Sequence, residues 1–302
     1  MKLSEYLHTI RFFGDDYITI EKMEALFKNI ANSNVNFVYI TEKMDININP
    51  ERPVIILSIN GDNDLPRAKS EMIIKYNGTQ FNQETQNWLD EMNYADKVDL
   101  EWLNNIDSNV IKIYANSIGK LGPKLNMVPL GRDFKNKNYF DLVDGFNKVD
   151  KTILCYYNVT LPPNCLHWYG MLRRHIYNII VKKNYITHKK CNIHPRQYSI
   201  ADILSYYTDL SKCKFMICPR GCGIDTYRLW DCIHMGCIPI VEKYEGYQQF
   251  EDLPILFIDS WKQIEYFTED YLENKWKSML EQDYDYNKMR MSYWENKILN
   301  TK

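Results

Sequence analysis

The chain has 302 residues, of which 45% are hydrophobic, 25% charged and 14% aromatic. This composition is typical of a folded globular protein, and the length suits two domains of about 150 residues each. The 37 Lys and Arg residues nearly balance the 39 Asp and Glu residues, which gives a formal net charge of -2. We expect no nucleic-acid partner, because sequence-independent phosphate binding requires a large basic excess.

Residues 1–22 lack the charged-then-apolar pattern of a signal peptide, and no window approaches the roughly 18 uninterrupted apolar residues of a membrane span. We therefore expect a soluble, cytoplasmic protein with no membrane span. The eight cysteines are too few for a disulfide scaffold. Five of them lie close together without forming a C-x-x-C pair, so we interpret them as buried thiols and expect no metal site: Cys213, Cys218, Cys222, Cys232 and Cys237.

Short apolar runs alternate with polar connections in the first half of the chain. Apolar runs at 36–41, 53–59 and 110–115 predict buried strands, and 125–134 resembles a strand that enters a Pro/Gly turn. Residues 83–92 have the pattern of a helix. Alternating strands and helices favour an α/β fold with a mainly parallel sheet.

The same alternation restarts near residue 150. The expected strands are 152–159, 214–218, 237–242 and 255–259, and the expected helices are 167–184, 198–213, 225–235 (ending at Gly236) and 260–267 (capped by Asp259 or Ser260). We predict two Rossmann-like domains, residues 1–150 and 151–285, that face each other across a cleft. The tail 286–302 is predicted to form a helix that packs back on the first domain.

Residues 215–241 predict a strand, a glycine turn, a helix and a second strand. Gly221 and Gly223 permit positive φ and let a ligand approach the backbone closely. Asp225 is the expected N-cap, and Thr226 and Tyr227 follow in the first helical turn. The unpaired N–H groups of a helix N-terminus form an anion site.

Two arginines flank this helix start. Arg220 precedes the turn and Arg228 lies one turn into the helix, where charge-assisted bonds to a pyrophosphate would be in reach. Asp231 shares a helix face with Arg228 and is a candidate for holding a ribose diol. The structural alternative is that Asp225 caps the helix, Arg228 forms a surface ion pair and the glycines only turn the chain. The combination of motif and context favours a binding site.

The stretch from 211 to 261 resembles the donor-binding segment of exostosin-like glycosyltransferases, which show a PRG-x-G-x-D-x-x-R-x-W-E core, then GCIPV and LP-x-L-x-x-x-x-W. The matching residues here are Pro219, Arg220, Gly221, Gly223, Asp225, Arg228, Trp230, Gly236, Cys237, Ile238, Pro239, Leu253 and Pro254. Asp231 stands where the family usually has Glu and Cys222 where it commonly has Asn, and we expect no counterpart of the family's membrane anchor.

This resemblance implies a GT-B fold, inversion at the anomeric carbon, no bound divalent metal and no cofactor besides a nucleotide-sugar donor, commonly a UDP-sugar. Arg220 and Arg228 would hold the diphosphate and Asp231 the ribose. The implied partners are the nucleotide sugar and a glycan or glycoprotein acceptor. From the residues alone, Arg173, Arg174 and Asn158 are further candidates for the donor pocket, because Asn158 ends the strand at 152–159 and the two arginines lie early in the helix that follows.

An inverting transfer needs a base for the acceptor hydroxyl. Asp62 and Asp64 follow the strand at 53–59 and are the first candidates, although Asp and Gly are also ordinary turn residues. Asp133, His167 and His234 are weaker candidates. We predict a glycosyltransferase, with a catalytically silent nucleotide-sugar- or glycan-binding partner of another transferase as the alternative. A dinucleotide-dependent oxidoreductase is disfavoured, because the N-terminus lacks a G-x-G-x-x-G motif.

Overall fold

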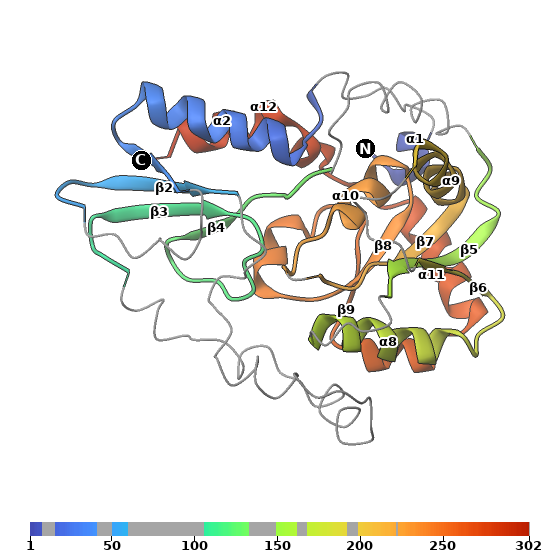
Figure 1. Cartoon of the computed structure of the whole chain (residues 1–302). Helices are drawn as coiled ribbons and strands as arrows, with labels where there is room; N and C mark the ends of the chain where they lie inside the picture. Colours follow the sequence, from blue (N-terminus) through green and yellow to red (C-terminus); the bar gives the residue numbers. More distant parts are fainter. Residues whose placement is uncertain are drawn as a thin grey trace.

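The computed structural model describes residues 1–7, 16–40, 50–59, 106–132, 149–161, 168–191, 199–221 and 223–301. Within these ranges the chain forms two parallel β-sheets with helices packed on them (Figure 1). The predicted α/β class with mainly parallel sheets is therefore confirmed. The helix predicted at 83–92 lies outside the described residues.

The first sheet belongs to the N-terminal half of the chain. Its strands follow one another in the order β1-β2-β3-β4, and each adjacent pair is parallel. They are β1 (Phe37–Tyr39), β2 (Val54–Ser58), β3 (Val110–Ala115) and β4 (Leu125–Met127). Every residue of β2 is buried, as expected of an apolar run inside a parallel sheet. All four strands lie where the apolar runs predicted them.

The second sheet belongs to the C-terminal half and has the order β6-β5-β7-β8-β9, again with parallel neighbours. Its strands are β5 (Ile153–Thr160), β6 (Ile186–Cys191), β7 (Cys213–Ile217), β8 (Ile238–Glu242) and β9 (Leu256–Ile258). The chain adds β6 on one side of β5 and then crosses to add β7 on the other. The order of the strands thus reverses between β5 and β7, which is a topological switch point.

Three helices connect these strands and were predicted at nearly the same positions. They are α8 (Trp168–Ile180), α9 (Ile200–Ser211) and α10 (Tyr227–His234). The α9 helix begins with a capping box between Ser199 and Asp202. The α10 helix ends before Gly236, whose φ of +61° is the left-handed conformation expected after a helix.

The predicted core face of α10 is also confirmed. Leu229, Trp230 and Ile233 are all buried. The segment after β9 differs from the prediction, because residues Trp261–Tyr266 form a 3₁₀ helix (η6) rather than an α-helix. Two further 3₁₀ helices are η5 (Glu245–Phe250) and η7 (Tyr286–Met289).

The two ends of the chain each pack on the opposite half of the molecule. At the N-terminus, α1 (Leu3–Tyr6) lies against α11 (Glu269–Leu280), and the Tyr6 ring stacks on Tyr286 with 4.0 Å between centroids. At the C-terminus, α12 (Met291–Leu299) lies beside α2 (Ile20–Ser33) over the first sheet (Figure 1). This exchange of ends joins the two halves.

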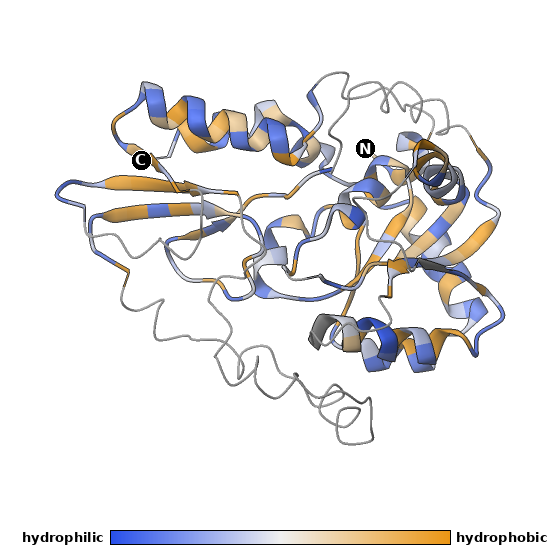
Figure 2. Ribbon diagram, viewed as in Figure 1, coloured by the Kyte–Doolittle hydropathy of each residue, from blue (hydrophilic) through white to orange (hydrophobic). Residues whose placement is uncertain are grey.

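The strands are largely hydrophobic, whereas the helices mix hydrophobic and hydrophilic residues (Figure 2). In α2 the buried residues are Met23, Phe27 and Ile30, which recur at the spacing of one helix face. None of the helices in the described part of the chain is long and apolar enough to cross a membrane.

Candidate functional site

The switch point places the carboxyl ends of β5 and β7 side by side at one edge of the second sheet. In open parallel sheets, ligands bind in the crevice at this position. The chain after β7 carries Arg220 and Gly221 and leads into α10, whereas the chain after β5 leads into α8. Arg173, Arg220 and Arg228 therefore lie on elements that meet where such folds bind their ligands.

Two arginines connect the two sides of this crevice. Arg228 Nε donates to the main-chain oxygen of Asn158 at 3.0 Å. Arg173 Nε donates to the main-chain oxygen of Arg220 at 3.0 Å, and Arg173 Nη1 lies 3.5 Å from the oxygen of Thr160. Both side chains are half-buried. We call Arg173, Arg228 and the main chain that they contact the arginine crevice.

The Tyr157 hydroxyl lies beside both arginines and donates to the Arg173 oxygen at 2.7 Å. Burial raises the pKa of Tyr157, and the positive charges of Arg173 and Arg228 act against that rise. The two guanidinium groups therefore act on one small region, which makes the crevice locally positive in a chain of nearly balanced charge. A phosphate group is the ligand that such a region attracts.

Gly221 provides room for this arrangement. A Cβ atom at Gly221 would lie 3.2 Å from Arg173 Nη2, and the φ of Gly221 is outside the left-handed region. The glycine thus serves the close approach of the Arg173 side chain, not a left-handed turn. Gly221 N also donates to the Gly223 oxygen at 3.1 Å, which closes the loop before α10.

The prediction that Asp225 caps α10 is wrong. The helix begins at Tyr227, its N-cap is Thr226, and the Thr226 side chain makes no capping hydrogen bond. The Asp225 carboxylate instead accepts from Trp230 Nε1 at 2.8 Å and from Leu130 N at 2.7 Å. Two strong donors, one of them in the N-terminal half, hold the carboxylate away from the helix start.

Asp231 also turns toward the N-terminal half. Its carboxylate forms an ion pair with Arg132, whose Nε lies 3.1 Å from Oδ1, and it interacts with the Tyr207 hydroxyl. Arg132 and Asp231 are only 1% and 6% exposed. Burial opposes the charge of Arg132, but Tyr207 and Asp231 outweigh it and raise the Arg132 pKa. Arg228 and Asp231 lie three residues apart on α10, as expected, but the ion-pair partner of Asp231 is Arg132.

We call the set formed by Asp225, Asp231, Leu130 and Arg132 the acidic contact. Sequence analysis did not single out Arg132, although it precedes the candidate Asp133. The only signal was an arginine in a short Pro/Gly segment, 129–132, between two halves of similar pattern. Gly131 has a φ of +74°, and a Cβ there would lie 2.8 Å from the Ile18 oxygen, so this segment requires a glycine.

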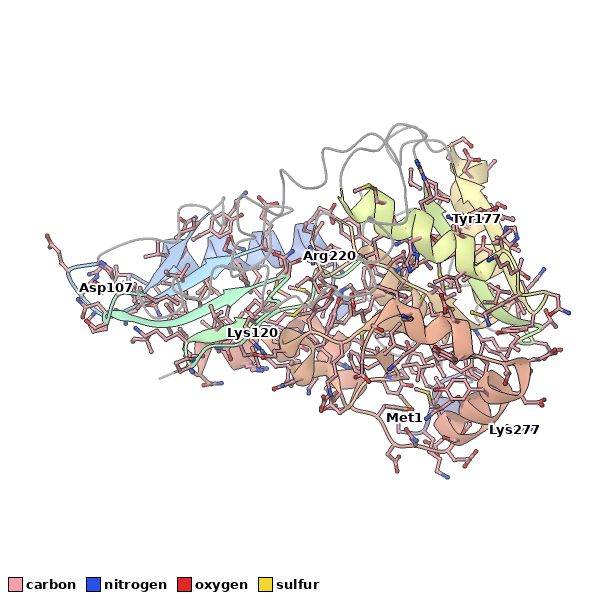
Figure 3. The ribbon with its side chains drawn as sticks, turned by 90° about the horizontal axis from the view of Figure 1, so that it is seen from below. Met1, Asp107, Lys120, Tyr177, Arg220 and Lys277 are labelled. Carbon is pink, nitrogen blue, oxygen red and sulfur yellow. The ribbon has the colours of Figure 1, made fainter. Side chains whose placement is uncertain are left out.

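The main chain and the side chain of Arg220 contact different parts of the molecule. Its main-chain oxygen belongs to the arginine crevice, whereas its guanidinium is buried and lies 5.8 Å from the centre of the Tyr244 ring, close to Glu242. Arg220 lies near the middle of the molecule (Figure 3). Of the arginines predicted to hold a diphosphate, Arg228 is the more exposed.

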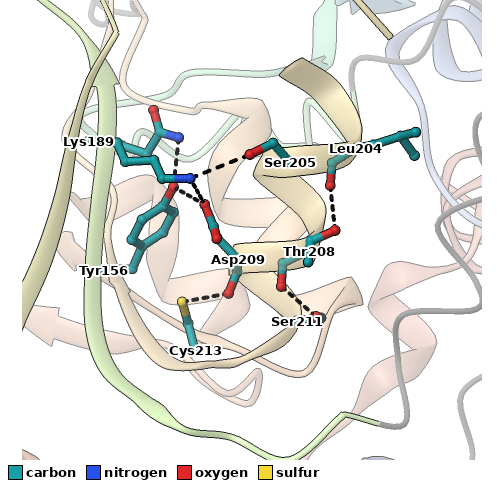
Figure 4. A network of polar contacts seen from close by, with 9 residues as sticks. Tyr156, Lys189, Leu204, Ser205, Thr208, Asp209, Ser211 and Cys213 are labelled. Atoms are coloured by element: carbon teal, nitrogen blue, oxygen red, sulfur yellow. Dashed lines mark hydrogen bonds and ion pairs between the residues drawn. The ribbon is translucent and has the colours of Figure 1, made fainter. Parts of the chain in front are cut away.

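Asn158 likewise presents different atoms to different neighbours. Its main-chain oxygen faces Arg228, but its side-chain Nδ2 donates to the Tyr156 hydroxyl at 2.9 Å. Tyr156 in turn donates to Asp209 of α9 at 3.0 Å, and Lys189 pairs with the same carboxylate (Figure 4). The Asn158 side chain thus belongs to a network on the α9 side of the sheet.

Three other predicted residues lie on α8 and α10. Arg174 is half-buried on α8, about 100° around the helix axis from Arg173. Tyr227 is the half-buried first residue of α10. His234 is buried at the opposite end of α10 from the arginine crevice.

Several candidates lie outside the described residues: Asp62, Asp64, Asp133, His167 and Cys222. The other clustered cysteines are buried free thiols, as predicted: Cys213, Cys218, Cys232 and Cys237. Burial raises the pKa of Cys232 well above its usual value, which disfavours a reactive thiolate. Within the described ranges, no group of three or more His, Cys, Asp or Glu side chains is arranged to hold a metal ion.

No protein-family model matches the chain, and a comparison with curated proteins found no match. A function is therefore inferred from the geometry of the arginine crevice and from the sequence motif that forms it.

Proposed function

We propose that the protein is an inverting, metal-independent glycosyltransferase of the GT-B type that uses a nucleotide-diphosphate sugar, with a UDP-sugar as the preferred donor. The observation that carries this proposal is the arginine crevice, in which Arg173 and Arg228 join the carboxyl end of β5 to the chain after β7 at the switch point. The acceptor is a hydroxyl group of a glycan.

The start of α10 supports the same proposal. The N-cap residue Thr226 makes no side-chain capping hydrogen bond, so its hydroxyl does not compete with a ligand at the start of α10. The positive end of the helix dipole favours an anion there. Arg228, one residue into the helix, would bind the same diphosphate from the side.

The arrangement of the two halves supports a catalytic base from the first sheet. The Asp225 N–H donates to Ser117 Oγ at 3.3 Å, so the carboxyl end of β3 faces the loop before α10. Ser58 at the end of β2 is paired in register with Ala115 at the end of β3. The chain that leaves Ser58 leads directly to Asp62 and Asp64, which we propose as alternative bases.

In the proposed reaction, an acceptor oxygen attacks the anomeric carbon of the donor sugar. The bond from that carbon to the diphosphate oxygen breaks, and its electron pair leaves with the nucleoside diphosphate. The acceptor proton passes to the carboxylate base. Arg173, Arg228 and the helix N-terminus stabilise the negative charge that grows on the leaving group.

A thermal-shift series with UDP, GDP and their sugar conjugates tests the donor site. At about 100 times Kd, a ligand adds roughly 2.7 kcal/mol to the free energy of unfolding. We expect UDP compounds to raise the Tm of the wild type, and to do so much less for Arg228→Ala. The matched control is Arg52→Ala, because Arg52 is an exposed arginine in the N-terminal half whose guanidinium donates to the Val35 oxygen at 3.0 Å.

Donor turnover then separates a transferase from a silent binding partner. Slow hydrolysis of a UDP-sugar by the wild type, absent in Arg228→Ala, supports catalysis. Stabilisation by UDP-sugars without any turnover, with or without glycan acceptors, would favour the silent partner. No stabilisation of the wild type by any nucleotide would overturn the proposed function.

A further inference from the structure

A small cavity lies at the same carboxyl edge of the sheet, between the end of β8 and the residues that follow β7 and β9. Its walls include Arg220, Glu242, Tyr244 and Trp261. It has room for about one water-sized group, so it suits a single hydroxyl and not a whole ring or a nucleotide.

The polar groups of this cavity are held in place by one another. Tyr244 donates its hydroxyl hydrogen to Glu242 Oε2 at 2.6 Å, and the Arg220 guanidinium lies close to both. Burial raises the pKa of Glu242, while Tyr244, Arg220 and Trp261 act in the opposite direction. The carboxylate is thus a fixed acceptor in the wall of the cavity.

Trp261 contributes a donor to the same space. Its indole Nε1 is buried near the Glu242 carboxylate, but it makes no hydrogen bond of normal geometry within the described part of the chain. Trp261 is only 4% exposed and forms part of the cavity wall. A buried donor of this kind usually has a well-aligned partner, so a ligand atom that accepts from Trp261 would satisfy it.

A carboxylate acceptor beside an indole donor matches a sugar hydroxyl, which can donate to Glu242 and accept from Trp261. Asp231, the residue expected to hold a ribose, already pairs with Arg132 in the acidic contact. Arg220 belongs to both the crevice and the cavity, so a phosphate and a neighbouring sugar can be bound together.

We propose that the cavity of Glu242, Tyr244 and Trp261 binds one hydroxyl of a sugar ring whose attached diphosphate occupies the arginine crevice. This inference rests on the proposed function. The ring has two sources in a UDP-sugar, namely the ribose of the nucleotide and the sugar that is transferred.

The test is a set of calorimetric titrations with inorganic pyrophosphate, UDP, 2′,3′-dideoxy-UDP and UDP-glucose. The variants are Glu242→Gln, which keeps an acceptor for the Tyr244 hydroxyl, and Trp261→Phe, which removes the indole N–H but keeps an aromatic ring. We expect neither variant to weaken pyrophosphate binding. If the ring is the ribose, both variants lower the affinity for UDP by about tenfold or more, and dideoxy-UDP binds the wild type correspondingly weakly.

If the ring is the transferred sugar, UDP binds both variants as it binds the wild type, and the affinity difference between UDP-glucose and UDP changes in the variants. Either pattern supports the inference. Unchanged affinities of both variants for UDP and UDP-glucose would overturn it and leave the proposed function intact. Failure of the wild type to bind either pyrophosphate or UDP would overturn the proposed function, and this inference with it.

Discussion

The acidic contact and the arginine crevice both include residues of the motif at 219–231, but they lie in different environments. The carboxylates of Asp225 and Asp231 are buried and bind groups of the N-terminal half, Leu130 N and Arg132. Arg173 and Arg228 remain half-buried at the switch point and donate to main-chain oxygens. The acidic side chains of the motif thus form a structural contact, whereas its arginine Arg228 belongs to a candidate binding site.

This comparison predicts the largest loss of stability at Arg132. Arg132→Ala leaves the buried Asp231 carboxylate without its ion-pair partner, which should lower the free energy of unfolding by about 3–5 kcal/mol. Urea unfolding followed by tryptophan fluorescence measures the loss. The double variant Arg132→Met/Asp231→Leu should recover most of it, because it removes both charges. A loss below about 1 kcal/mol for the single variant would show that the acidic contact does not stabilise the fold.

A smaller loss is expected at Asp225. Asp225→Ala removes the acceptor for both Leu130 N and Trp230 Nε1, and we expect it to cost about 2–3 kcal/mol. Asp225→Asn keeps one acceptor oxygen and should cost less. The same urea titration compares the two. Equal stability of wild type and Asp225→Ala would mean that these two donors find other partners.

The arginine crevice should behave in the opposite way. Arg228→Ala loses a hydrogen bond to the Asn158 oxygen from a half-buried side chain, so we expect a cost of only about 1 kcal/mol. Its binding of diphosphate should nevertheless fall steeply. A cost as large as that of Arg132→Ala would erase the distinction between the two regions, and urea unfolding of both variants decides it.

The smallest expected effect is a dependence of stability on pH at Glu242. Burial raises the pKa of Glu242 above its usual 4.5, so the folded state binds this proton more tightly than the unfolded chain does. The stability from this group is complete below the unfolded pKa and is lost as pH rises through the folded pKa. Glu242→Gln lacks that loss, so its stability relative to wild type should increase from about pH 4 to about pH 7. A constant difference would contradict the raised pKa.

Much of the fold was predictable because its signals are local. The strands at β2, β3, β5, β7 and β8 are apolar runs bounded by polar turns, and Gly236 ends α10 as its position indicated. The helices α2 and α11 and the strand β6 were not predicted. Their polar residues outnumber or interrupt the apolar ones, and α2 shows its buried face only through Met23, Phe27 and Ile30.

The site was predictable in its residue types but not in its contacts. The motif placed Arg228 and Arg220 near a helix start, and a sequence pattern contains no information on what lies across the sheet edge. Leu130 and Arg132 lie about a hundred positions earlier in the chain, and they determine that Asp225 is not a cap and that Asp231 is paired. Glu242 ends β8 and Trp261 follows β9, and neither residue was a candidate in the sequence.

The most direct test of the arginine crevice is a calorimetric titration of inorganic pyrophosphate into the wild type, Arg228→Ala and Arg52→Ala. Pyrophosphate carries the diphosphate charge without a base or a sugar, so it measures the crevice alone. We predict binding to the wild type and to Arg52→Ala with the same Kd, and at least about tenfold weaker binding to Arg228→Ala. Equal binding to all three proteins, or no binding to the wild type, would contradict the assignment of the crevice as a diphosphate site.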